Sequence, residues 1–388
     1  MSDSIYLDYN ATPPLLPEVL EAMRLCYEAP LLNPASHHEF GRRARCALGN
    51  SRERIAELLG ASVGGDADRV IFTGSGTEAN NLAVFGLLGG RDAPPGQIIL
   101  SSIEHPSISA SGDYLARKGW QVDRLGVDSD GVVRLDHLRA VLTPETRLVA
   151  VMLGNNETGV LQPIAKIAAI CRKKNVLLHT DAAQVVGKLP VSFRELNANS
   201  MSLAAHKCHG PVGIGALVVR HGTPLVNDQY GGSQQAQLRP GTESVPLTAG
   251  LSRALEMWDT QRETRPTHLA ELRDRFETLI TASWPTAVIL GQNAPRLPHT
   301  SNIALVGVDR QALLLALDQA GVACSTGSAC ASGSSEPSPV HQAMGCSEKV
   351  CQSALRFSLG VPTTRSDVEE AARRVIATAT RLLANKPA

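Results

Sequence analysis

Short apolar runs that alternate with longer helical patterns constrain the fold of this chain more than any other feature of its sequence. Between about residue 50 and residue 220, six such runs have the length and β-branched content of strands: Val70–Thr73, Gln97–Ser101, Gln121–Gly126, Leu148–Leu153, Val176–Thr180 and Gly215–Arg220. This alternation predicts an α/β domain with a mostly parallel sheet covered by helices. Because parallel sheets bind ligands at the carboxyl ends of their strands, the residues after these runs are the first candidates for chemistry.

The pattern changes after about residue 245. Two long helical patterns, Pro246–Thr260 and Pro266–Ser283, come first. Further short strands and helices are expected at Val288–Leu290, Ser301–Val306, Asp309–Ala320, Leu355–Ser358 and Ser366–Leu383. Ser366 and Glu369 have the spacing of a capping box at the start of the last helix. The sequence therefore predicts a second, smaller α+β domain.

The charge balance and the cysteine count exclude several classes of protein. Lys+Arg and Asp+Glu both total 37, so the chain lacks the basic footprint of a nucleic-acid binder. Its apolar stretches end well before the ~18 residues of a membrane helix. Eight cysteines in 388 residues are too few for a disulfide scaffold, and the N-terminus lacks the features of a signal peptide. We therefore expect a cytoplasmic protein with reduced thiols and no membrane or nucleic-acid partner.

A glycine-rich turn follows the first predicted strand. The segment 72–81 reads Phe-Thr-Gly-Ser-Gly-Thr-Glu-Ala-Asn-Asn and runs from the strand end into a helix. Glycines let the backbone approach a ligand, and the free amides at a helix start favour a phosphate. The segment matches neither the Walker pattern nor the dinucleotide fingerprint, so a plain tight turn and a phosphate cradle both remain open.

An aspartate and a lysine further along the chain favour the interpretation of this turn as a phosphate site. Asp181 directly follows an apolar strand, where it could simply cap a helix, and Lys207 follows 26 residues later. A phosphate-type loop, a strand-end aspartate and a lysine in one βα array are the set that pyridoxal 5'-phosphate needs: the lysine forms the Schiff base and the aspartate pairs with the pyridinium nitrogen. Cys208 and His209 have no second pair at metal-ligand spacing, so no metal site is expected.

Nine segments, in order along nearly the whole chain, resemble motifs of the NifS/IscS type of cysteine desulfurase, within the class V, fold-type I pyridoxal phosphate enzymes. They are Tyr6–Thr12, Gly76–Asn81, Glu104–Pro106, Asn155–Gly159, Asp181–Gln184, His206–Lys207, Arg239–Glu243, Ser325–Ser335 and Arg356–Gly360. The resemblance implies a large cofactor-binding domain, residues 15–255. It also implies a small domain that joins residues 1–14 to 256–388 and carries a mobile loop at about 324–336.

The resemblance also assigns roles around the cofactor ring. Lys207 resembles the lysine that binds the cofactor and moves the substrate Cα proton, and Asp181 resembles the partner of the ring nitrogen. His105 resembles the catalytic histidine that stacks on the ring. Gln184 and Asn156 would contact the phenolic oxygen or orient the ring.

Other positions match residues that bind the phosphate and the substrate. Gly76, Thr77 and His206 resemble the phosphate site, and Thr242 resembles a residue that reaches the phosphate of a neighbouring subunit, which implies a homodimer. Arg356 resembles the arginine that clamps the substrate carboxylate, a task that suits its planar fork, with Asn156 beside it.

Cys330 lies in the Gly/Ser-rich segment from Ser325 to Ser335. A lone cysteine is most often a buried apolar residue, but a flexible loop suits a thiol that must travel between a cofactor and an acceptor. The loop resembles that of the long-loop branch of the family. The resemblance thus implies conversion of L-cysteine to L-alanine, with a persulfide on Cys330 that passes to an acceptor protein such as an iron–sulfur cluster scaffold.

Three positions depart from the family pattern. Ala204 stands where the family usually has a serine, and Gln235 and Ala236 replace an acid and a base. Two alternatives therefore stay open beside the desulfurase. One is a selenocysteine lyase or another class V pyridoxal phosphate enzyme such as an aminotransferase, although the long cysteine loop argues against transamination. The other is a non-catalytic scaffold for sulfur transfer.

Overall fold

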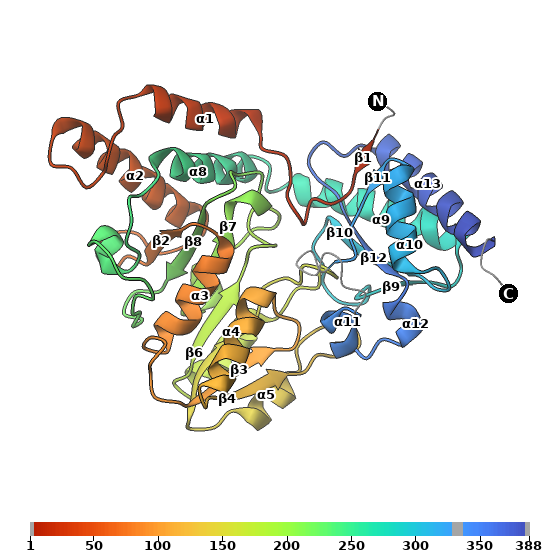
Figure 1. Ribbon diagram of the computed structural model, residues 1–388, viewed down its shortest axis with the longest axis horizontal. Coiled ribbons are helices and arrows are strands. Elements are labelled where there is room, and N and C mark those ends of the chain that lie inside the picture. The colour runs from red at the N-terminus through yellow and green to blue at the C-terminus, as the bar shows by residue number, and fades with distance from the viewer. Residues whose placement is uncertain (1–3, 328–336, 385–388) are drawn as a thin grey trace.

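The chain folds into a larger and a smaller part, which Figure 1 shows side by side. The computed structural model describes residues 4–327 and 337–384. The larger part contains a seven-stranded sheet, and the smaller part contains a three-stranded and a two-stranded sheet. Cys330 lies outside the described residues.

The seven-stranded sheet has the strand order β2-β8-β7-β6-β5-β3-β4. Its strands are β2 (Arg69–Thr73), β3 (Gln97–Ser101), β4 (Gln121–Leu125), β5 (Thr146–Ala150), β6 (Leu177–Asp181), β7 (Ser200–Ala204) and β8 (Gly215–Val219). Neighbouring strands are parallel except for β8, which is antiparallel to both β2 and β7. The predicted mostly parallel sheet is confirmed, and β7 is a strand that the apolar runs did not predict.

Helices cover both faces of this sheet. They are α2 (Glu39–Leu58), α3 (Gly76–Leu87), α4 (Pro106–Arg117), α5 (Leu135–Val141), α6 (Ile164–Arg172), α7 (Phe193–Leu196) and α8 (Val245–Asp259). Successive side chains of a strand point to opposite faces. Ile98 and Leu100 of β3 accordingly pack in the apolar cluster under α3 and α4, whereas Ile99 packs in the cluster that includes residues of α2, α6 and α8. The sheet is thus buried on both sides, as its continuous apolar strands require.

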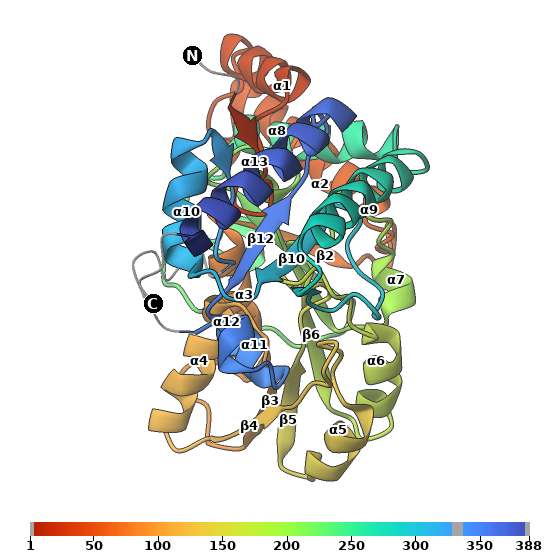
Figure 2. The same cartoon turned by 90° about the vertical axis from the view of Figure 1, so that its right-hand side faces the viewer.

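The smaller part is built around β10 (Thr300–Leu305), which pairs antiparallel with both β9 (Ala287–Ile289) and β12 (Ala354–Ser358). Figure 2 shows α9 (Arg265–Ser283), α10 (Arg310–Gln319) and α13 (Arg365–Ala384) around these strands. Phe276 and Phe357 pack in its apolar core with ring centroids 4.9 Å apart. The short helices α11 (Pro339–Ala343) and α12 (Glu348–Cys351) complete this part.

The N-terminal strand β1 (Ile5–Tyr6) belongs to the smaller part, although nearly the whole chain separates it from its partner. It pairs in parallel with β11 (Val322–Ala323). Beyond β1, the Ser358 N–H donates to the carbonyl oxygen of Leu7 at 2.8 Å. The smaller part therefore joins both ends of the chain.

The predicted capping box at Ser366 and Glu369 is wrong. Helix α13 begins one residue earlier, and the reciprocal pair is Thr364 and Asp367: the Thr364 N–H donates to Asp367 Oδ2 at 2.8 Å, and the Asp367 N–H donates to Thr364 Oγ1 at 3.1 Å. Both pairs have the spacing of three residues that a capping box requires. Thr364 lies just before the helix, where the capping residue must be, whereas Ser366 lies within the first helical turn.

The predicted division at residue 255 falls inside α8, which packs against α1 (Pro17–Glu28) and α2. Within the described ranges, none of the helices combines the length and the apolarity that crossing a membrane requires.

Candidate active site

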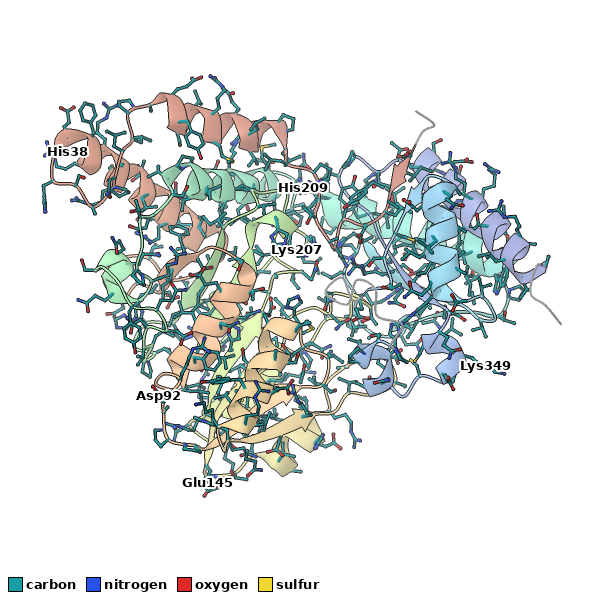
Figure 3. All side chains as sticks on the ribbon, viewed as in Figure 1. His38, Asp92, Glu145, Lys207, His209 and Lys349 are labelled. Carbon is teal, nitrogen blue, oxygen red and sulfur yellow. The ribbon has the colours of Figure 1, made fainter. Side chains whose placement is uncertain are left out.

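A cavity of about 810 Å³ lies where the carboxyl ends of the parallel strands face the smaller part. The predicted site residues that line it are Gly76, Thr77, His105, Asn156, Asp181, Gln184, His206, Lys207 and Arg356. Figure 3 shows Lys207 between the two parts of the molecule. Thr242 is exposed and does not line this cavity, and Cys330 lies outside the described residues. Gly327, the last described residue before that segment, lies in the cavity wall.

Asp181 ends β6 with a buried carboxylate held by two donors. Its Oδ2 accepts from Asn80 Nδ2 at 2.7 Å, and its Oδ1 accepts from the Ala183 N–H at 2.9 Å. Asn80 is itself fixed, because its Nδ2 also donates to Ser107 Oγ at 2.8 Å and its Oδ1 lies 3.1 Å from His179 Nε2. These contacts hold the carboxylate in one orientation in the cavity.

His105 caps the N-terminus of α4. Its Nδ1 accepts from the Ser107 N–H at 3.1 Å, so the neutral ring carries its proton on Nε2. Burial lowers the pKa of His105, nearby Asp181 raises it in opposition, and Lys207 lowers it further. The ring is therefore neutral near pH 7, which suits stacking on an aromatic ligand and exchanging a proton.

Lys207 lies in the short 3-10 helix η1 (Ala205–Lys207), directly after β7. Its Nζ donates to the carbonyl oxygens of Asn10 and Ala11, at 2.8 and 2.7 Å. Both acceptors belong to the N-terminal segment, so that segment orients the lysine amine within the cavity. The sequence motifs predicted the lysine, but these two carbonyl partners come only from the fold.

The start of α3 forms the polar end of the cavity. Ser75 caps the helix by accepting from the Glu78 N–H at 3.1 Å, and Gly76 and Thr77 follow in its first turn. A Cβ on Gly76 would lie 3.1 Å from the Cβ of Ala204, so this turn approaches β7 closely and any larger residue would have to displace Ala204 by a few tenths of an ångström. Burial lowers the pKa of His206 to about 4, with Lys207 and Lys188 adding to the effect.

Arg356 is a buried arginine in β12 that reaches the cavity from the smaller part. Its Nη2 pairs with Asp8 Oδ1 at 2.6 Å, and its Nη1 donates to the carbonyl oxygens of Asn156 and Gly327 at 2.9 and 3.2 Å. Its side chain is 2% exposed. The guanidinium is thus held in place, with its charge at the cavity wall.

The sequence of this chain matches the family model for aminotransferase class-V over residues 5–370. The chain belongs to the class-V aminotransferase family.

Individual class-V relatives agree with this assignment. The chain is 38% identical to the cysteine desulfurase IscS of Dictyoglomus turgidum, over 95% of this chain and 92% of that protein. It is 37% identical to the cysteine desulfurase NifS of Azotobacter vinelandii, over 96% and 91%. Among solved structures, a NifS-like protein superposes with a TM-score of 0.89 at 31% identity, covering 98% of this chain and 100% of that one. The NifS/IscS resemblance and the fold-type I architecture predicted from the sequence are confirmed.

Pyridoxal 5'-phosphate is the cofactor of this class-V enzyme, as the sequence predicted, and the cavity suits it. The amides that begin α3 and the side chain of Thr77 provide donors for a phosphate, while Asp181 provides a carboxylate for a protonated ring nitrogen. Lys207 lies in the same wall. Among the described residues, no cluster of three or more His, Cys, Asp or Glu side chains forms a metal site.

Three polar residues of the class-V site have contacts that the sequence did not predict: Asn10, Asn80 and Glu104. Burial raises the pKa of Glu104 to about 8, although its Oε1 accepts from the Met152 N–H at 2.8 Å. Asn10 places the carbonyl that receives Lys207, and Asn80 fixes Asp181. Each lies in or beside a motif that was recognised, but its role depends on a partner far away in the sequence.

Two of the three departures from the family pattern have a structural account. Gln235, in the 3-10 helix η2 (Gln234–Gln237), accepts from the Phe72 N–H at 2.7 Å and donates to the Phe72 carbonyl at 2.8 Å. An acid at this position could not make both bonds, because an ionised carboxylate only accepts. Ala204 fills the space beside Gly76. The structure does not explain the alanine at position 236, where φ is +57°.

Proposed function

We propose that this protein is a pyridoxal phosphate-dependent cysteine desulfurase that converts L-cysteine to L-alanine and forms a persulfide on Cys330. The observation that carries the proposal is the convergence of Lys207, Asp181, His105 and Arg356 on one cavity whose wall includes Gly327, at the start of the cysteine segment. The cysteine desulfurase relatives support the same activity.

Each residue has a distinct task in this proposal. Bound pyridoxal phosphate supplies an electron sink for negative charge at the substrate Cα. Arg356 binds the substrate carboxylate, and Asn156 helps to orient the ring and the substrate beside it. Lys207 takes the Cα proton, and the neutral ring of His105 moves a proton near the sulfur. Asp181 keeps the ring nitrogen protonated.

The sulfur step balances without an external oxidant. The Cys330 thiolate attacks the substrate sulfur, so the substrate C–S bond breaks as a new S–S bond forms. The Cβ of the substrate gains a proton and Lys207 returns a proton to Cα, which gives L-alanine. The enzyme retains the sulfur as a persulfide on Cys330, which a further thiol can accept.

Three finer parts of the function follow from the same reasoning. We infer that an acceptor protein, such as an iron–sulfur scaffold, takes the persulfide sulfur. We infer a homodimer in which Thr242, exposed and away from its own cavity, reaches the phosphate site of a second copy. An oxidising compartment would convert thiols and persulfides to disulfides. The described cysteines are all free thiols, so we infer that the reaction takes place in the reducing cytoplasm.

The test is to add L-cysteine to the cofactor-loaded protein and to follow both products. We expect L-alanine in solution and a mass increase of one sulfur on the Cys330 peptide, reversed by a reductant. Cys330→Ala should lose both signals, whereas Cys46→Ala, which removes an exposed thiol outside the cavity, should keep them. Cofactor-loaded parent protein that produces neither alanine nor persulfide would refute the proposal.

A further inference from the structure

Lys188 is a buried lysine one turn beyond Gln184, on the segment that follows β6. It is 7% exposed, and its Nζ donates to Gln184 Oε1 at 2.9 Å. Gly187 makes this placement possible: its φ is +79°, and a Cβ there would lie 2.3 Å from the Cβ of Cys208. The chain therefore turns tightly enough to direct a long cationic side chain back to the cavity wall.

The ammonium of Lys188 determines which way the amide of Gln184 points. An ammonium only donates hydrogen bonds, so it accepts the oxygen of the amide as a neighbour and repels its NH₂ group. With Oε1 held by Lys188, Nε2 points away and donates to the carbonyl oxygen of Asn10 at 3.1 Å. A reversed amide would place donor against donor on one side and acceptor against acceptor on the other.

The Asn10 carbonyl links this pair to the cofactor lysine. It accepts from Gln184 Nε2 at 3.1 Å and from Lys207 Nζ at 2.8 Å. Gln184 and Lys207 both line the cavity, whereas Lys188 is not part of the cavity wall. These contacts thus connect Lys188 through Gln184 and Asn10 to Lys207. We therefore expect a substitution of Lys188 to affect the groups that line the cavity.

The charges around Lys188 disfavour its ammonium form. Within the described part of the chain, no carboxylate lies within ion-pair distance of its Nζ. Burial lowers the pKa of Lys188 to about 7; the positive charges of Lys207 and Arg356 lower it further, and Cys208 opposes them. Lys188 in turn contributes to the lowered pKa values of three neighbouring histidines, His206, His209 and His299.

We propose that Lys188 is a positioning residue of the desulfurase: it fixes the amide of Gln184 in the cavity wall, and through it the Asn10 carbonyl that holds Lys207. The proposal rests on the cofactor-binding function proposed above. It assigns a role to a residue that never touches the substrate.

The test measures cofactor binding and the absorbance of the bound cofactor, separately from turnover. In Lys188→Met we expect the dissociation constant of pyridoxal phosphate to rise ~10-fold, the loss associated with one hydrogen bond to a charged group. Removal of the neighbouring cation should also raise the pH midpoint of the bound-cofactor absorbance, because Lys207 then holds its proton more readily. Lys166→Met, at an exposed lysine of α6, should change neither quantity.

A double-mutant cycle separates positioning from a merely structural role. If Lys188 acts through Gln184, the cofactor affinity of the double variant Lys188→Met with Gln184→Leu should equal that of Gln184→Leu alone. Additive losses, or parent-like affinity and absorbance in Lys188→Met, would overturn the proposal. A parent protein that binds no pyridoxal phosphate would instead overturn the proposed function.

A second variant keeps the inference testable if Lys188→Met does not fold. In Lys188→Arg, the cation still offers only donors to Gln184 Oε1, so the dissociation constant of pyridoxal phosphate should stay close to that of the parent. A loss of cofactor affinity as large as that in Gln184→Leu would contradict the proposal, because the donor to the Gln184 oxygen is retained.

Discussion

Replacement of Arg356 by lysine provides the sharpest test of how the smaller part contributes to catalysis. The guanidinium uses Nη2 for Asp8 at 2.6 Å and Nη1 for two carbonyl oxygens, and its fork lets it present further N–H groups to a ligand at the same time. A lysine ammonium at this position can pair with Asp8, but it cannot also keep the second set of bonds and face the substrate carboxylate.

The expected size of the effect follows from this geometry. Loss of one hydrogen bond to a charged group costs about 1.5–3 kcal/mol, which corresponds to about 10- to 150-fold in kcat/KM. The carboxylate does not change during the reaction, so the ground state and the transition state lose the same binding. We therefore expect a higher KM for L-cysteine with kcat little changed.

The assay is alanine formation against L-cysteine concentration, with the cofactor saturating. Arg310→Lys is the matched control, since Arg310 is also buried, donates to the Cys351 carbonyl and lies outside the cavity wall. Its kcat/KM should stay at the parent value. A parent-like KM in Arg356→Lys, or an equal loss in Arg310→Lys, would show that Arg356 has no specific role at the carboxylate.

Two further predictions concern groups that the sequence did not single out. In Asn80→Ala, Asp181 loses its donor at 2.7 Å, so the dissociation constant of pyridoxal phosphate should rise ~10-fold, whereas Asn81→Ala should leave it unchanged; equal values in the two variants would contradict the role of Asn80. The raised pKa of Glu104, about 8, means that the folded apoprotein holds a proton that the unfolded chain releases, so stability falls as the pH rises from about 4.5 towards 8. Between pH 5 and 7 this loss is about 2–3 kcal/mol; Glu104→Gln should remove it in denaturant titrations, and parallel pH profiles for parent and variant would contradict the assignment.

The fold could be predicted wherever local pattern and burial agree. Strands such as β3 are buried on both faces and read as continuous apolar runs. Strand β7 was missed because Ser200 and Ser202 alternate with its apolar residues. These hydroxyls are buried but not unsatisfied: they meet His179 and Asn80 from neighbouring elements. No local pattern in the sequence shows that such serines have partners.

The site could be predicted where a motif carries its own chemistry. Most predicted site residues line one cavity, because strand ends of a parallel sheet meet at one edge. Lys188 could not be identified in this way, because a lysine in a sequence is by default a solvated charge. Its burial depends on the close approach of Gly187 to the Cβ of Cys208, which is a contact between distant parts of the sequence.

The pairing of β1 with β11 has a consequence for the order in which the enzyme is built. The carbonyl groups that hold Lys207 lie just after β1, whose partner strand is made more than 300 residues later. During synthesis, the larger part can fold before β11 and β12 have left the ribosome, so β1 is still unpaired at that stage. The lysine therefore receives its backbone acceptors late, and a nascent chain stalled before residue 322 should bind the cofactor more weakly than the released protein.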